Sequence, residues 1–261
     1  MADLFSSFPE STTVLIQGAS RGIGLSMVRL SLENSHVSRV IATSRNPNQS
    51  EALLSLRDQH PDKLHLIAMD ISSEDSIRQA ALDFQALQEE LHLILNVSGV
   101  LHDKTRQMSP EKKLDDLRPE DALYAFQVNA LGPLLVAKHF LPFLSSQRAV
   151  IANLSARVGS ISDNHLGGWY SYRASKAAQN MFTRTLSIEL GRYRKSHQAI
   201  CVALHPGTVE TDLSAPFRKH VPSDKLFDPE RAALQLLEII DGLTTEDQGK
   251  FFAWDGQLIP W

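Results

Sequence analysis

Gly18-Ala19-Ser20-Arg21-Gly22-Ile23-Gly24 places three glycines within seven residues near the start of the chain. It follows a short β-type apolar run at residues 12–17 and leads into a helical pattern with an apolar stripe. Glycines placed in this way allow a tight turn, and they let the backbone approach a pyrophosphate at the N-terminus of the helix. The spacing is Gly-x-x-x-Gly-x-Gly rather than Gly-x-Gly-x-x-Gly, so an ordinary glycine-rich turn is the alternative interpretation.

Strand-like and helix-like patterns alternate along the rest of the chain. Strands are predicted at residues 12–17, 39–43, 64–69, 93–96, 149–153, 199–204 and 250–254. Helices are predicted at residues 23–34, 50–60, 74–90, 119–145, 169–195 and 229–241. This order predicts an α/β fold of the Rossmann type, a doubly wound parallel sheet of about seven strands with helices on both faces. No linker is visible, so we expect one domain spanning residues 1–261.

Composition narrows the class of protein. The chain has 261 residues, 43% of them hydrophobic, and a net charge of −4 without a lysine or arginine block, which argues against a nucleic-acid partner. No apolar run is long enough for a membrane helix, and no signal peptide is evident, so a cytoplasmic location is expected. The single cysteine, Cys201, lies in an apolar strand pattern and is expected to be buried. No His, Cys and Asp cluster has metal-ligand spacing, so no metal is predicted.

Polar residues and glycines follow six of the predicted strands. Parallel strands end at one edge of the sheet, and ligands bind there near the point where the strand order reverses. The residues that follow the strands are Gly18 to Gly24, then Ser44 and Arg45, Asp70, Asn96 to Gly99, Ser155, and His205-Pro206-Gly207. We therefore expect a ligand site at this edge.

Tyr172 and Lys176 are separated by four residues within a predicted helix, which puts both side chains on one face. A lysine ammonium beside a phenol favours the phenolate, so the pair predicts a lowered pKa for Tyr172. Such a phenol can give or take a proton near neutral pH. The pattern is short, and alone it also occurs by chance on amphipathic helices.

Two polar stretches interrupt the alternation. Residues 101–118 are expected to form a solvated loop or, alternatively, a rim over the site. Residues 215–228 contain Pro216, Pro222 and several charges, and are expected to form a mobile flap before the last helix.

Taken together, the glycine pattern, Ser155, the Tyr172 and Lys176 pair and Pro206-Gly207 resemble the short-chain dehydrogenases/reductases. The resemblance spans nearly the whole chain. Residues 157–164, the run Gly167-Gly168-Trp169-Tyr170 and residues 254–261 resemble the branch of C-factor and sniffer-type carbonyl reductases. The resemblance implies a cofactor half at about residues 10–150 and a catalytic half at about residues 150–261.

Four catalytic residues are implied by the resemblance. Asn129 would hold a water in a proton relay, Ser155 would hydrogen-bond the substrate oxygen, and Tyr172 would exchange a proton with it. Lys176 would lower the pKa of Tyr172 and bind the nicotinamide ribose. Without the resemblance, the alternative interpretation of Asn129 is an asparagine that kinks a helix or is hydrogen-bonded in the core. The alternative for Ser155 is a helix cap or turn residue.

Cofactor contacts are implied for a larger set: Gly18, Ser20, Arg21, Gly22, Ile23, Gly24, Ser44, Arg45, Asp70, Ile71, Asn96, Val97, Ser98, Gly99, Tyr172, Lys176, Pro206, Gly207, Val209 and Thr211. An NAD site would have a carboxylate after the second strand, where this chain has Ser44 and Arg45, with Arg21 nearby. Guanidinium groups suit a 2′-phosphate, so NADP(H) is the preferred cofactor, with NAD(H) possible. The alternative is that either arginine is only a solvated surface residue.

Two departures from the family pattern concern the site. Val97 stands where the family usually has a second asparagine, which puts the hydrogen bonding around Asn96 to Gly99 in question. The interval from Ser155 to Tyr172 is longer than usual in the family, and the extra residues fall in the substrate loop before Gly167-Gly168.

Apolar side chains at Val158, Ile161, Leu166 and Trp169 predict a pocket for a small apolar aldehyde or ketone, or the matching alcohol. Asn164 and His165 add polar points, and His165 is expected to be a loop residue rather than a catalyst. The expected function is NADPH-dependent carbonyl reduction. The alternatives are a cofactor-binding, C-factor-like signalling protein and an NAD-dependent alcohol dehydrogenase. The resemblance also implies a homodimer or homotetramer.

Overall fold

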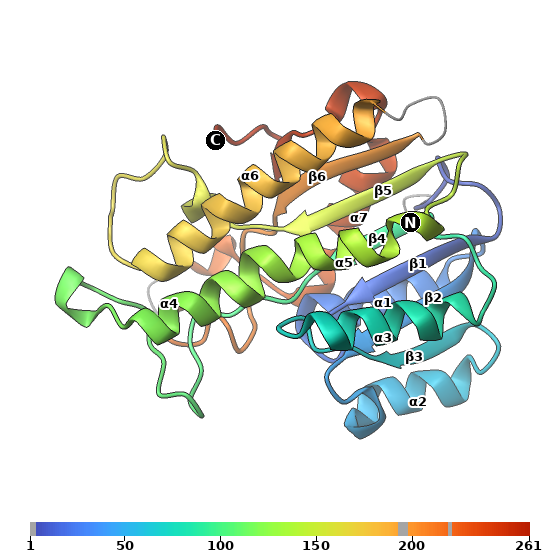
Figure 1. Ribbon diagram of the computed structural model, residues 1–261, viewed down its shortest axis with the longest axis horizontal. Coiled ribbons are helices and arrows are strands. Elements are labelled where there is room, and N and C mark those ends of the chain that lie inside the picture. The colour runs from blue at the N-terminus through green and yellow to red at the C-terminus, as the bar shows by residue number, and fades with distance from the viewer. Residues whose placement is uncertain (1–3, 193–197, 219–220) are drawn as a thin grey trace.

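The computed structural model describes residues 4–192, 198–218 and 221–261. Its central element is a parallel sheet of seven strands (Figure 1). In spatial order these are β3 (Leu64–Ala68), β2 (Val37–Ser44), β1 (Thr12–Gln17), β4 (Leu93–Asn96), β5 (Ala149–Leu154), β6 (Ala199–His205) and β9 (Phe251–Ala253). The predicted fold class and all seven strand positions are confirmed. A small second sheet pairs β7 (Thr208–Val209) with β8 (Leu226–Phe227).

Helices cover both faces of the sheet (Figure 1). One face carries α1 (Gly22–Glu33), α2 (Glu51–Gln59) and α7 (Pro229–Gly242). The other carries α3 (Glu74–Gln85), α4 (Pro119–Phe126), α5 (Gly132–Phe140) and α6 (Tyr170–Arg192). Strands β1, β4 and β5 are buried along their whole length, because helices pack on them from both sides.

Short helical turns complete the secondary structure: η1 (Pro47–Gln49), η2 (Leu114–Asp116), η4 (Leu141–Phe143), η5 (Arg157–Gly159), η7 (Ser223–Lys225) and η8 (Thr245–Asp247). Within the described ranges, no helix is long and apolar enough to cross a membrane, and no group of three or more His, Cys, Asp or Glu side chains is placed to hold a metal ion.

The strand order reverses at β1. The chain passes from β1 to β2 and β3 on one side, and then returns to place β4 on the other side of β1. Gln17 and Asn96 are directly paired at the ends of β1 and β4. The segments that follow these two strands therefore open a crevice at the carboxyl edge of the sheet.

The prediction of one helix at residues 119–145 is wrong. The structure has α4, a π-helical segment η3 (Gln127–Leu131), α5 and then η4. Pro133 lies in the first turn of α5, lacks a backbone N–H and crowds the preceding turn, which accounts for the widened segment. Asn129 lies inside this π segment, and such segments are frequent at functional sites.

Two further helix ends differ from the prediction. The helix predicted at 74–90 ends at Gln85, and Gln88 takes a left-handed conformation (φ 56°) that no α-helix continues through. The helix predicted at 169–195 is α6, Tyr170–Arg192, and residues 193–195 lie outside the described part of the chain.

Residues 101–118 and 215–228, the two stretches predicted to be irregular, both contain buried side chains. The 101–118 segment is largely exposed, but Leu101, Met108 and Glu111 are buried in it, so it is not only a solvated loop. In the 215–228 segment, residues 219–220 are not described, and its last residues form β8, which pairs with β7. Buried Phe227 anchors that end of the segment.

Candidate active site

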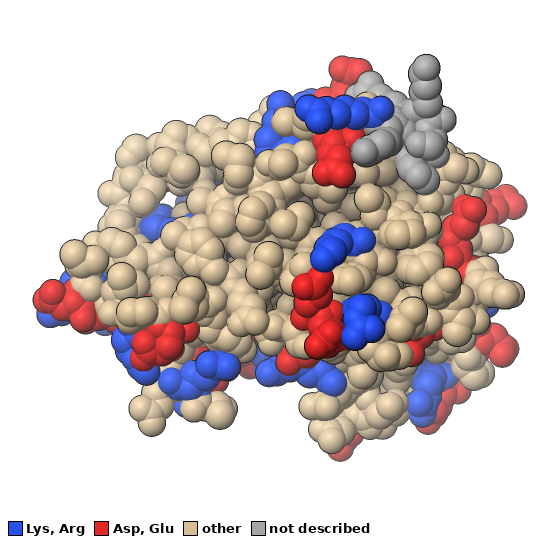
Figure 2. All heavy atoms as spheres, in the orientation of Figure 1, with Lys and Arg blue, Asp and Glu red and all other residues tan. Residues whose placement is uncertain are grey.

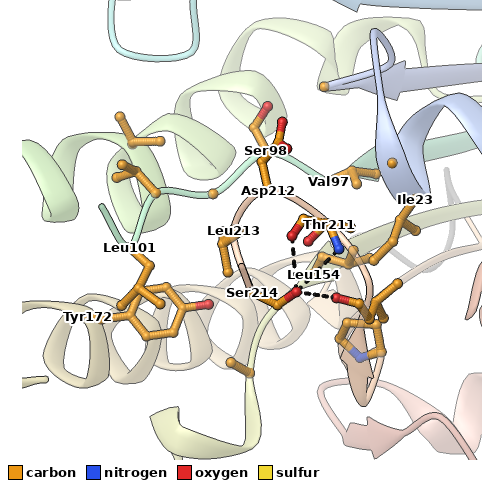
Figure 3. Close-up of a pocket in the computed structure, with 18 of the residues that line it drawn as sticks. Ile23, Val97, Ser98, Leu101, Leu154, Tyr172, Thr211, Asp212, Leu213 and Ser214 are labelled. Carbon is orange, nitrogen blue, oxygen red and sulfur yellow. Dashed lines mark hydrogen bonds between the residues drawn. The ribbon is translucent and has the colours of Figure 1, made fainter. Parts of the chain in front are cut away.

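A cavity of about 1280 Å³ opens at the carboxyl edge of the sheet (Figure 3). Its walls come from the glycine turn, the ends of β2 to β6, the first turns of α6 and the segment after β7. Nearly all of the predicted site residues line it: Gly18, Ser20, Arg21, Gly22, Ile23, Ser44, Arg45, Asp70, Ile71, Val97, Ser98, Gly99, Ser155, Tyr172, Lys176, Pro206, Gly207, Val209 and Thr211. Gly24, Asn96 and Asn129 do not line it; Gly24 packs against Gly18 and Asn129 bonds Val100, both in the wall, whereas Asn96 bonds Asn153.

The glycine turn is closely packed against its neighbours. Gly18 has a φ of +89°, and a Cβ there would lie 2.5 Å from Ser98 Oγ. A Cβ on Gly24 would collide with the carbonyl oxygen of Gly18. Helix α1 begins after this turn without a side-chain cap from Arg21 and without an acidic residue in its first turn. Its N-terminal amides and the positive end of its dipole are therefore suited to an anionic group.

Because Val97 replaces an asparagine of the family pattern, the hydrogen bonding of the loop after β4 was in question. Gln17 makes hydrogen bonds to this loop. Val97 N donates to the Gln17 backbone oxygen at 3.0 Å, and Ser98 N donates to Gln17 Oε1 at 3.2 Å. Gln17 Nε2 in turn donates to Ser98 Oγ at 2.8 Å. One residue before Val97, at the end of β4, Asn96 Nδ2 donates to Asn153 Oδ1 at 2.8 Å, and both side chains are buried. The Gln17 side chain thus holds Ser98, whereas Asn96 Oδ1 is buried with no hydrogen-bond partner among the described residues.

The segment after β7 forms part of the cavity wall. Ser214 Oγ accepts the Thr211 N–H at 3.2 Å and donates to the Val209 oxygen at 2.6 Å, bonds that are drawn in Figure 3. Asp212 forms an ion pair with Arg21 at 2.8 Å, and its backbone oxygen lies 3.0 Å from His102 Nε2. This segment therefore links the glycine turn to the loop after β4.

Arg21 and Arg45, the two arginines expected near a 2′-phosphate, differ in whether an acidic side chain pairs with them. Arg21 has an acid beside it, because Asp212 is its ion-pair partner, and the sequence did not predict this contact. Arg45 is exposed at the end of β2 and lines the cavity. Within residues 4–192, 198–218 and 221–261, Arg45 has no ion-pair partner. Of the two guanidinium groups, that of Arg45 is the freer to bind an anion.

Tyr172 and Lys176 lie one turn apart on α6 and both are buried at the cavity wall. Lys176 Nζ lies 6.0 Å from the centre of the Tyr172 ring, and it donates to the Leu154 oxygen at 2.7 Å and to Gln179 Oε1 at 3.0 Å. Burial lowers the pKa of Lys176 to about 7. A lysine with this pKa changes its charge near neutral pH.

The predicted lowering of the pKa of Tyr172 is wrong for this structure, because burial raises that pKa above its ordinary value. The prediction relied on a charged Lys176 beside the phenol. Here the ammonium is itself desolvated and is turned toward Leu154 and Gln179, so the cost of burying a phenolate outweighs the attraction. The phenol is held in its protonated form.

Ser155 lies at the end of β5 and donates its hydroxyl proton to Asn180 Oδ1 at 2.6 Å. Asn180 Nδ2 faces the Gly159 oxygen at 3.4 Å, which orients the amide. The sequence analysis missed Asn180, although it follows Tyr172 and Lys176 at the same four-residue spacing on α6. To donate to a ligand in the cavity, the Ser155 hydroxyl must first leave Asn180.

Asn129 joins the π segment to the loop after β4 and to α6. Its Oδ1 accepts the Val100 N–H at 2.7 Å, and its Nδ2 donates to the Val100 oxygen at 2.8 Å and to Ser175 Oγ at 3.0 Å. The asparagine is buried, and its amide is satisfied by these three bonds. It therefore sets the position of the loop beside Lys176, whose Nζ would lie 3.6 Å from a Cβ on Gly99.

The apolar pocket differs in part from the prediction. Val158, Leu166, Trp169 and His165 line the cavity, whereas Ile161 and Asn164 are exposed and lie outside it. The structure adds Leu101, Tyr124, Leu213 and Phe217, which come from segments far apart in the sequence. In Figure 3, Leu101 and Leu213 lie beside the Tyr172 ring. The end of the cavity nearest Tyr172 is thus mostly apolar.

Comparison with known proteins places this arrangement in a family. Residues 12–222 match the short chain dehydrogenase family. The solved structure of an NADPH-bound carbonyl reductase from chicken fatty liver is 31% identical, with a TM-score of 0.85 over 97% of this chain and 95% of that one. The carbonyl reductase Sniffer of D. melanogaster is 27% identical, with a TM-score of 0.83 over 96% and 99% of the two chains.

A further relative supports the branch inferred from the sequence. C-signal of Myxococcus xanthus is 38% identical over 150 residues, which are 57% of this chain and 83% of that protein. The similarity to this protein and to sniffer-type carbonyl reductases confirms the resemblance found in the sequence. With its parallel sheet, its glycine turn and its match over most of its length, the chain belongs to the short-chain dehydrogenase family of oxidoreductases.

Proposed function

We propose that this oxidoreductase uses NADPH to reduce a small apolar aldehyde or ketone to its alcohol, with Tyr172 as the proton donor. One observation carries the proposal: Tyr172 and Lys176 are buried together in the wall of the cavity that begins at the glycine turn. The site therefore offers a dinucleotide-sized crevice and a protonated phenol within one cavity.

The residues of the cavity fit NADP. Gly18 and Gly24 have no room for a Cβ, and the uncapped start of α1 suits a pyrophosphate. Asp70 is held by Ser72, whose N and Oγ donate to Asp70 Oδ1 at 2.9 and 2.7 Å, so it is a fixed wall residue. We propose that the predicted residues lining the cavity contact the cofactor, and that Gly24 and Asn96 act behind them through packing and hydrogen bonding.

The roles of the catalytic residues follow from their positions. Bound in this cavity, the nicotinamide would supply the hydride that adds to the carbonyl carbon. Negative charge then grows on the carbonyl oxygen, and Tyr172 donates its phenolic proton to that oxygen, which yields the alcohol. Ser155 would bind the same oxygen after its hydroxyl turns away from Asn180.

Lys176 and Asn129 support this proton transfer. Because burial lowers the pKa of Lys176 to about 7, its ammonium could return a proton to Tyr172 near neutral pH. Asn129 would hold the loop at Val100 and, through Ser175, the helix that carries Tyr172.

The assay that tests the proposal follows NADPH oxidation by absorbance with a panel of aldehydes, ketones and quinones. NADPH-dependent turnover that requires Tyr172 would support the reductase. Tight NADPH binding without turnover would instead favour a cofactor-binding signalling role, which the similarity to C-signal keeps as the second candidate. Pure binding needs no buried phenol, and for this reason we favour the enzyme.

The proposed preference for NADPH rests on Arg45. We expect Arg45→Glu to weaken NADPH binding by about 10- to 100-fold, because a carboxylate would repel the 2′-phosphate that the guanidinium attracts. NADH binding should change little or improve, since a carboxylate can accept the ribose hydroxyls. Dissociation constants measured for NADPH and for NADH give the ratio of the two affinities in each variant. Arg29→Glu is the matched control, an exposed arginine on α1 outside the cavity. An unchanged ratio in Arg45→Glu would refute the assignment.

We also propose that the chain self-associates through α4 and α6. Figure 2 shows few charged side chains over much of this face. Large apolar side chains stand exposed on it: Leu123 and Phe126 on α4, Leu131 in the π segment, and Met181 and Ile188 on α6. Exposed apolar surface of this kind often marks an interface. Light scattering should give the mass of a dimer or a tetramer, and a monomer would contradict the proposal.

A further inference from the structure

Glu111 is a buried carboxylate that the proposed chemistry does not use. It lies in the charged segment between β4 and α4, yet only 5% of it is exposed, whereas Lys112 and Lys113 beside it are exposed. Across the described ranges, Glu111 has no ion-pair partner. A buried carboxylate without a countercharge is costly unless hydrogen-bond donors surround it.

The donors come from the first turn of α6. Ser171 N lies 3.3 and 3.4 Å from the two carboxylate oxygens of Glu111, and Ser171 Oγ donates to Oε1. Helix α6 has no acidic residue in its own first turn. Glu111 therefore provides, from a distant segment, the negative charge and the acceptor that the N-terminus of a helix needs. Tyr172 is the next residue along this turn.

The backbone oxygen of Glu111 accepts a hydrogen bond from an unusual turn that precedes α6. Gly167, Gly168 and Trp169 have φ values of 65°, 65° and 51°, three left-handed residues in succession. Glycine adopts this conformation freely, whereas a bulky residue such as Trp169 adopts it only under external constraint. The Trp169 N–H donates to the Glu111 backbone oxygen at 2.6 Å, and the Trp169 oxygen accepts Arg173 N at 2.8 Å.

This turn directs the Trp169 indole to the cavity. The indole lies 6.2 Å from the Tyr172 ring in an edge-on arrangement, and 5.0 Å from the Phe217 ring in a tilted one. Both Trp169 and Phe217 line the cavity. A flat apolar group beside the carbonyl would thus meet aromatic side chains, with which it can stack or make edge contacts.

We propose that Glu111 is a positioning residue for the substrate site. Its carboxylate holds the start of α6 and its backbone holds Trp169, and together they place an aromatic wall beside Tyr172 that favours carbonyl compounds with an aryl group. This specificity rests on the proposed carbonyl reduction, but the placement of Trp169 by Glu111 does not, and the two can be measured separately.

The experiment compares Glu111→Ala and Glu111→Gln with Asp115→Asn, an exposed acid of the same segment, as the matched control. The near-ultraviolet circular dichroism of each variant is recorded, and Trp169→Phe identifies the part of the signal that comes from this indole. Glu111→Ala keeps the backbone oxygen but removes the carboxylate that fixes residue 111 against Ser171, so we expect the backbone to shift and the Trp169 part of the signal to be lost. Glu111→Gln can still accept from Ser171 and should keep most of that part, and Asp115→Asn should keep all of it. If Glu111→Ala does not fold, Ser171→Ala removes the hydroxyl partner and serves in its place.

Kinetics with an aryl ketone and a short aliphatic aldehyde complete the test. We expect Glu111→Ala and Trp169→Leu to raise the KM for the aryl ketone about tenfold, with a smaller change for the aldehyde and no change in NADPH affinity. If Glu111 only stabilised the fold, Glu111→Ala would lower the melting temperature but leave the KM values and the NADPH affinity unchanged at temperatures where the variant is folded. That result would overturn the proposal. An intact Trp169 signal in Glu111→Ala would also overturn it. If the wild type turns over no carbonyl compound, the proposed function is wrong. The near-ultraviolet circular dichroism of the variants would still test whether Glu111 positions Trp169.

Discussion

Replacing Tyr172 with phenylalanine is expected to lower carbonyl turnover by about a thousandfold or more, because a general acid of this kind contributes about 10²- to 10⁴-fold. Phenylalanine keeps the edge-on contact with Trp169 and removes only the phenolic oxygen. Burial raises the pKa of Tyr172, so the side chain carries its proton throughout the neutral range. The affinity for NADPH should change by no more than about twofold, because only a hydroxyl is lost.

Steady-state NADPH oxidation and a direct NADPH-binding titration check this result together. Tyr170→Phe is the matched control, since Tyr170 lies two residues earlier on the same helix and is 44% exposed. Its hydroxyl should be dispensable. Full activity in Tyr172→Phe would mean that another group donates the proton. Equal losses in both variants would point to a defect in the helix rather than in the chemistry.

Replacing Gly24 with alanine is expected to be the most damaging single-methyl change in the cofactor half. The added Cβ would collide with the Gly18 carbonyl oxygen and would lie 3.2 Å from the Cα of Ala19, so backbone and not a flexible side chain must move. Overpacking of this kind costs about 1–3 kcal/mol of unfolding free energy. Because the same turn would bind the pyrophosphate, we expect NADPH affinity to fall by about 10- to 100-fold.

Urea unfolding and NADPH titration measure the two effects on one preparation. Gly191→Ala is the control, because Gly191 lies in α6 with no atom within 4 Å of its added Cβ. That variant should bind NADPH normally and be equally or slightly more stable, since alanine favours a helix. If Gly24→Ala bound NADPH as tightly as the wild type, the glycine turn would not be the pyrophosphate site.

Much of the fold could be predicted because its signals are local. The seven apolar runs and the glycine turn between residues 17 and 24 are short-range patterns, and parallel connectivity follows from the alternation with helices. The strand-end rule brought Ser155 to the edge of the sheet, helical spacing aligned Tyr172 with Lys176, and only the family resemblance joined the pair to Ser155; in the structure all three line one cavity. The break at Asn129 was missed because a helical apolar pattern continues across it, although Pro133 was a visible warning.

Periodicity and backbone conformation act over a few residues, and for this reason the order of the strands, the turn at Gly18 to Gly24 and the alignment of Tyr172 with Lys176 could be inferred from local patterns. The raised pKa of Tyr172, the pairing of Arg21 with Asp212, the bond from Ser155 to Asn180 and the burial of Glu111 against Ser171 arise only when the chain is folded. These depend on desolvation and on contacts between segments that are, in the case of Arg21 and Asp212, 191 positions apart. No short pattern specifies how much water remains around a side chain once the chain has folded.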